Sequence, residues 1–157
     1  MKRGDLRAAA IVVLGLMALP GTAYALGTSS TPDSSKADPY KQAEDLIDDE
    51  EYAKAIPLLQ KSIKEKGEYA DALNLLGYAN RKLGDKAKAL TYYTKALNLE
   101  PDHLGANEYL GELYLEMNDL AKAEERLDVL KKACGDCDEY DDLADEIDDY
   151  KEEHGLS

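Results

Sequence analysis

The tripeptide Ala-Lys-Ala occurs three times in this chain, at residues 53–55, 87–89 and 121–123, so that successive copies begin 34 positions apart. A fixed period of this size is typical of stacked helical hairpins, in which each hairpin buries its apolar face against its neighbours. The period therefore predicts an elongated, all-α protein. Because such stacks present a continuous groove, it also suggests that the chain binds another protein.

Aligning the three segments at this period shows that small and bulky residues repeat in fixed places. A small residue recurs where two helices must approach closely, at Ala43, Gly77 and Gly111. Another falls on the last alanine of each tripeptide, and a bulky residue follows four positions later, at Leu59, Tyr93 and Leu127. Side chains of neighbouring helices interlock when small residues face large ones. We therefore expect these positions to form the core.

The turns repeat with the same period. Gly84 and Asn118 tolerate the left-handed backbone that ends a helix, and Asp85 and Asp119 can each cap the helix that follows. Order is expected to begin at residues 38–39, where an Asp precedes a Pro that suits the first helical position. The chain thus predicts helix, short turn and helix in succession.

Together these residues resemble the tetratricopeptide repeat (TPR) family. The middle segment matches its pattern at Leu73, Leu76, Gly77, Gly84, Asp85, Ala89, Tyr93, Ala96 and Pro101. The third keeps Leu110, Gly111, Tyr114, Ala123 and Leu127 but departs at Asn107, Leu130 and Gly135, and the first keeps chiefly Ala43, Ala55 and Leu59. The resemblance implies an all-α, right-handed α-solenoid of three helix-turn-helix hairpins, spanning approximately 38–69, 70–103 and 104–137.

The segment 138–157 follows a different pattern. Its apolar residues recur at helical spacing of three and four, at Tyr140, Leu143, Ile147 and Tyr150, and most of the others are acidic or basic. One apolar stripe on a charged helix is what is needed to cover the open end of a solenoid. We expect a capping helix and a short tail.

The first 25 residues are typical of a secretory signal peptide. Lys2, Arg3 and Arg7 precede an uncharged apolar run at 8–19, and Ala23 and Ala25 offer small residues for cleavage after Ala25. The alternative, an uncleaved anchor, needs roughly 20 apolar residues, more than this run has. We expect a bacterial protein exported to the periplasm without stable membrane insertion, with residues 26–37 as a flexible linker.

The chain carries a formal net charge of −14. The electrostatic field of so acidic a protein repels nucleic acid and anionic membrane. A charge of this sign suits either simple solubility or a basic partner. The acidic runs at 48–51 and 138–146 lack the alternating oxygens and glycine turn of a calcium loop, so they are interpreted as solvated charge.

The first helices of the hairpins should line an inner, concave surface. The side chains expected on its free face, each set offset by one period, are Tyr40, Glu44, Ile47, Asn74, Tyr78, Arg81, Glu108, Glu112 and Leu115. Aromatic anchors and an arginine among polar groups are typical of a surface that contacts a partner. The open ends of the stack also leave self-association possible.

Some members of the family hold the carboxylate at the C-terminus of chaperones with a clamp of Lys, Asn and Arg on this face. This chain has Tyr40, Glu44 and Glu108 in or near those places. Because an acidic groove repels a carboxylate, a basic or hydrophobic segment is the expected ligand.

Cys134 and Cys137 stand at the junction of the last hairpin and the capping helix. Three interpretations compete: a disulfide pinning the turn, a catalytic dithiol, and a metal site. A dithiol of that kind belongs on a scaffold with strands, which nothing here predicts, and a closed zinc site needs two more ligands than the pair supplies. The only histidines, His103 and His154, lack ligand spacing to the pair.

No constellation for catalysis or cofactor binding stands out, so no enzyme activity, metal or cofactor is predicted. The sequence favours a non-catalytic scaffold or adaptor for protein–protein interaction in the bacterial cell envelope. The alternative is a redox-linked or metal-linked periplasmic factor that uses Cys134 and Cys137, with the repeats docking a client.

Overall fold

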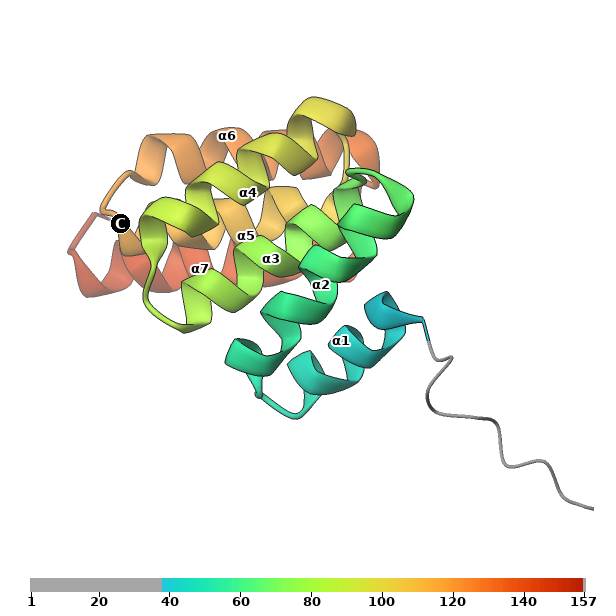
Figure 1. Cartoon of the computed structure of the whole chain (residues 1–157). Coiled ribbons are helices and arrows are strands. Elements are labelled where there is room, and N and C mark those ends of the chain that lie inside the picture. The colour runs from blue at the N-terminus through green and yellow to red at the C-terminus, as the bar shows by residue number, and fades with distance from the viewer. Residues whose placement is uncertain (1–37, 157) are drawn as a thin grey trace, which may run out of the picture. The chain divides into compact units, whose positions relative to one another are not determined.

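The computed structural model describes residues 38–156, so the expected signal peptide and linker lie outside the described residues. The described part consists of helices and turns without a strand (Figure 1). The helices are α1 (Pro39–Asp48), α2 (Tyr52–Lys66), α3 (Ala70–Lys82), α4 (Lys86–Leu99), α5 (Leu104–Glu116), α6 (Leu120–Ala133) and α7 (Asp138–Glu153). The all-α prediction is confirmed. Within these residues no helix is both long and apolar enough to cross a bilayer.

The helix ends follow from local chemistry. The Asp38 carboxylate accepts a hydrogen bond from the Tyr40 amide at 3.1 Å, with Pro39 in the first turn. Asp85 and Asp119 cap α4 and α6 in the same way. The turns before them contain the predicted left-handed residues, Gly84 at φ 84° and Asn118 at φ 60°.

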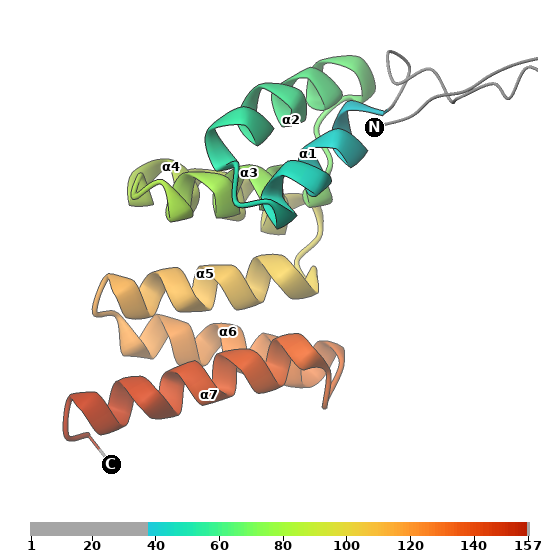
Figure 2. The same cartoon turned by 90° about the horizontal axis from the view of Figure 1, so that it is seen from below.

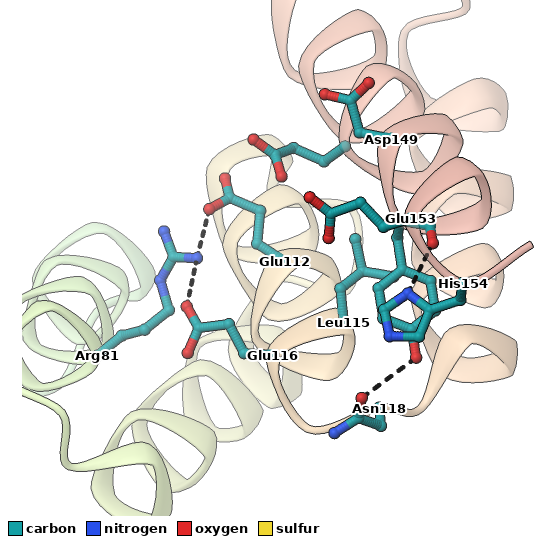
Figure 3. A pocket seen from close by; sticks show the side chains of 10 residues that line it. Arg81, Glu112, Leu115, Glu116, Asn118, Asp149, Glu153 and His154 are labelled. Atoms are coloured by element: carbon teal, nitrogen blue, oxygen red, sulfur yellow. Dashed lines mark hydrogen bonds and ion pairs between the residues drawn. The ribbon is translucent and has the colours of Figure 1, made fainter.

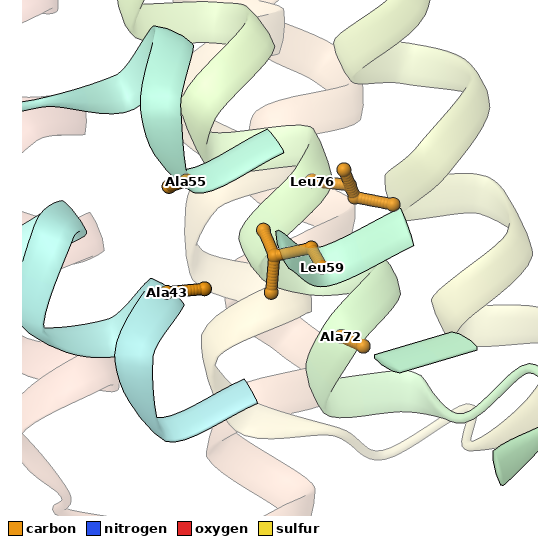
Figure 4. Close-up of a cluster of buried hydrophobic side chains, with 5 residues drawn as sticks. All are labelled: Ala43, Ala55, Leu59, Ala72 and Leu76. Atoms are coloured by element: carbon orange, nitrogen blue, oxygen red, sulfur yellow. The ribbon is translucent and has the colours of Figure 1, made fainter. Parts of the chain in front are cut away.

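The helices pair in chain order and stack in layers (Figure 2). The strongest pairings are α1 with α2, α3 with α4 and α5 with α6, and each second helix also packs on the first helix of the next hairpin. Figure 4 shows how the first two hairpins join, with Leu59 of α2 lying among small residues from α1 and α3. This cluster comprises Ala43, Ala55, Leu59, Ala72 and Leu76.

Helix α7 covers the end of the stack that the last hairpin, α5 and α6, would otherwise leave open. It packs on both α5 and α6, the position that the first helix of a further hairpin would take. Leu143 and Ile147 are buried, and Tyr140 and Tyr150 are partly buried beside them, so the predicted apolar stripe faces the core.

Candidate partner-binding groove

The first helices of the hairpins lie in series. Helix α1 contacts α3, α3 contacts α5, and α5 contacts α7. The nine side chains expected on the inner face are distributed along α1, α3 and α5, three on each helix. The fold therefore gathers them along one line of contacting helices.

These side chains differ in how much surface they expose. Tyr40, Glu44, Ile47, Tyr78 and Glu112 are partly exposed. Asn74, Arg81, Glu108 and Leu115 are nearly covered, at 6%, 7%, 7% and 7% exposure respectively. The expected free face is thus open along α1 but largely closed along α3 and α5.

Leu115 departs most from the expectation. It packs in a cluster with Leu143 and Ile147, because α7 lies against the part of α5 that was expected to face solvent. Leu115 therefore contributes mainly to the core beneath the capping helix, with only its edge at the surface.

A hollow of about 420 Å³ opens where α3, α5 and α7 meet, and we call it the acidic hollow (Figure 3). It is lined by Arg81, Glu112, Leu115, Glu116, Asn118, Glu146, Asp149, Tyr150, Glu153 and His154. The Tyr150 hydroxyl donates to the Asn118 side chain at 3.4 Å, which ties α7 to the turn after α5. The ring of His154 stacks on that of Tyr150 at 4.0 Å between centroids.

A second hollow of about 250 Å³ lies on the side of α1 and α2, and we call it the aromatic hollow. It is lined by Ile47, Asp48, Glu50, Tyr52, Leu75, Tyr78 and Tyr109. The Tyr78 ring lies 5.9 Å from that of Tyr52 and 4.8 Å from that of Tyr109, so three rings from three helices lie together at this hollow.

Arg81 stands between the two hollows. Its guanidinium forms ion pairs with Glu112 and with Glu116, the latter at 3.3 Å. It also lies 5.6 Å from the centre of the Tyr78 ring and 5.7 Å from that of Tyr109. Burial opposes the charge on Arg81, but the two carboxylates outweigh it, so the pKa of Arg81 lies above its ordinary value.

Glu108 lies in a less favourable setting. Burial, together with the carboxylates of Glu112, Asp142 and Glu139, raises the pKa of Glu108 to about 8. The Arg81 guanidinium acts in the opposite direction but does not offset this. Around Glu108, carboxylates therefore outweigh the positive charge of Arg81.

The cysteine pair lies at the junction of α6 and α7. Cys134 and Cys137 are joined in a disulfide with Cα atoms 5.7 Å apart. His103 is committed elsewhere, since it caps α5 by accepting from the Ala106 amide at 3.1 Å and bonds Asp71 at 3.0 Å. Among residues 38–156, no group of His, Cys, Asp and Glu is arranged to hold a metal ion.

The contribution of α7 to this surface was not predicted from the sequence. Glu146, Asp149 and Glu153 line the acidic hollow, whereas the pattern of 138–157 indicated only a cap. A signal was present, because Asp142, Glu146 and Asp149 follow Glu108, Glu112 and Leu115 by one further period. Tyr52 and Tyr109, which complete the aromatic hollow, lie outside the register chosen for the inner face.

Comparisons with known proteins agree with this architecture. Two models of the tetratricopeptide repeat match the chain, over residues 40–102 and 80–147. A comparison with curated protein sequences finds no match.

Solved structures share the fold at low sequence identity. A tetratricopeptide repeat protein from Parabacteroides merdae superposes with a TM-score of 0.63 at 16% identity, over 76% of this chain and 46% of that one. This chain therefore spans less than half of that protein. The type III secretion chaperone SycD of Yersinia enterocolitica was solved with a peptide of the translocator YopD. It superposes with a TM-score of 0.63 at 18% identity, over 75% of this chain and 90% of SycD. The second TPR domain of human RPAP3 was solved with an HSP70 peptide. It superposes with a TM-score of 0.63 at 16% identity, over 73% of this chain and 92% of that domain.

Proposed function

The chain belongs to the tetratricopeptide repeat family, and on that basis we propose that it is a non-catalytic scaffold that binds a segment of a partner protein in the groove described above. The two hollows are lined by residues of α1, α2, α3, α5 and α7, so together they offer contacts along several helices to an extended segment. No covalent step is part of this proposal.

The observation that carries the proposal is that Arg81, which lines the acidic hollow, lies 5.6 Å from the ring of Tyr78, which lines the aromatic hollow. Tyrosine is among the residues that contribute most to binding in protein interfaces, and the tyrosines here are partly exposed. The complexes of SycD with a YopD peptide and of RPAP3 with an HSP70 peptide support the proposal by analogy of fold.

Affinity capture with two tyrosine variants tests this function. Tyr78→Ala removes a ring that lines the aromatic hollow, whereas Tyr92→Ala removes another partly buried ring, on α4, that lines neither hollow. We expect Tyr78→Ala to lose the specific partner and Tyr92→Ala to retain it, with thermal melting showing that both variants fold. A partner that stays with Tyr78→Ala as strongly as with the parent would place binding outside the groove.

We also propose that the protein is exported and acts in the bacterial periplasm. The basic start, the apolar run at 8–19 and the small residues before position 26 support this. Mass spectrometry of the protein from a periplasmic extract should find an N-terminus at Leu26. A protein that keeps residues 1–25 and stays with the membrane fraction would contradict the proposal.

A further inference from the structure

We propose that α7 is a wall of the groove as well as a cap, and that the segment bound there is basic. A Lys or Arg side chain of the partner enters the acidic hollow, and an apolar side chain close to it in the same segment occupies the aromatic hollow. This inference rests on the proposed function and specifies its ligand.

Helix α7 is oriented so that two of its faces contact different parts of the molecule. One face of the helix places Leu143 and Ile147 in the core, which is all that capping requires. A different face brings Glu146, Asp149 and Glu153 to the acidic hollow, which Glu112 of α5 also lines. Figure 3 shows Asp149 and Glu153 on α7 and Glu112 on α5. The capping helix therefore adds carboxylates to the surface that α3 and α5 begin.

The acidic hollow has more carboxylates than cationic side chains. Arg81 pairs with Glu112 and Glu116, and Lys86 also lies 3.1 Å from Glu116. Within residues 38–156, the three α7 carboxylates at this hollow form no ion pair. The hollow thus has an excess of negative charge that a cationic ligand would complement.

The kind of cation follows from geometry. The carboxylates of the described residues are not arranged to hold a metal ion, whereas the ammonium or guanidinium of a long side chain can reach several separate carboxylates. The nearby aromatic hollow suits an apolar side chain, since Tyr78 lies one helical turn from Arg81 on α3. One short peptide can therefore occupy both hollows.

The protein itself offers two other occupants for the acidic hollow, a second copy of the chain and the chain's own first 20 residues. A second copy would bring like charge to the hollow, because the chain has a net charge of −14. The chain's own first 20 residues are basic and apolar, so a peptide of that sequence belongs in the test as a competitor.

Selection from a library of short random peptides on beads tests the inference. The parent protein should enrich peptides with Lys or Arg close to an apolar residue. The double variant Glu146→Gln, Asp149→Asn should lose the preference for Lys and Arg and bind a selected peptide about tenfold more weakly. The matched variant Asp141→Asn, Asp148→Asn removes the same charge from exposed positions on α7 outside the hollow, and it should behave like the parent.

The outcomes separate this inference from the function on which it rests. Peptides that depend on Tyr78 but show no enrichment of Lys or Arg would overturn the inference and leave the groove function standing. Equal losses in both double variants would also overturn it, because the effect would then be one of net charge alone. If no selected peptide depends on Tyr78, the groove function itself is wrong. Tighter binding of the peptide 1–20 than of any selected peptide, or sedimentation showing that the groove holds a second copy, would replace the partner as the occupant.

Discussion

The ring of Tyr93 fills the space beside Gly77. A Cβ atom added at Gly77 would lie 2.5 Å from both Cδ1 and Cε1 of that ring, well inside van der Waals contact. Tyr93 has no exposed surface, and its ring cannot bend away as an aliphatic chain can. This contact is the physical reason for a small residue at this place in the middle hairpin.

Gly77→Ala should therefore destabilise the protein. The overlap with Tyr93 costs about 1–3 kcal/mol, partly offset by the roughly 1 kcal/mol that alanine gains over glycine inside a helix. Urea unfolding followed by circular dichroism measures the difference. The same change in a Tyr93→Leu background should cost less, and an unchanged free energy of unfolding in the Tyr93 protein would show that this contact does not constrain the hairpin.

The third hairpin uses its glycine differently. A Cβ atom at Gly111 would lie 2.5 Å from Cδ2 of Leu143, on α7. By contrast, Gly77 contacts the second helix of its own hairpin. We expect Gly111→Leu to push α7 off the stack and to speed amide hydrogen exchange in α7, while exchange in α3 stays as in the parent. Uniform acceleration over both helices would contradict this expectation.

The helices could be predicted from the sequence because their signals are local. The caps at Asp85 and Asp119 and the left-handed turns at Gly84 and Asn118 depend on a few adjacent residues, and all four occur as expected. Glu50, left-handed at φ 59°, was not foreseen, since glutamate gives no signal for that conformation.

The groove was harder to predict because exposure depends on distant segments. Leu115 has the spacing of an inner-face residue, yet it is covered because α7 packs across α5. The α7 carboxylates at the acidic hollow were missed because their only signal is the further 34-residue period; in their local sequence they do not differ from solvated charge.

The disulfide between Cys134 and Cys137 should contribute little to stability. The cysteines are three residues apart, and the entropy of closing so small a loop accounts for at most about 2 kcal/mol. Cys134→Ser with Cys137→Ser should therefore melt a few degrees lower and keep partner capture. Loss of capture in a folded double variant, or rapid exchange of the pair with a dithiol donor, would instead support the redox-linked function.

Glu108 should make the protein less stable as the pH rises. Its pKa is raised from about 4.5 to about 8 by burial and by the carboxylates of Glu112, Asp142 and Glu139, so between these values the folded state keeps a proton that the unfolded state has lost. This contribution is therefore fully present below pH 4.5 and is lost as the pH rises towards 8, and a pKa difference of this size corresponds to about 5 kcal/mol. Glu108→Gln should remove it, and the difference in free energy of unfolding between variant and parent should grow from pH 5 to pH 8. The exposed control Glu125→Gln should follow the parent; a constant difference for Glu108→Gln across that range would show that Glu108 is ionised throughout.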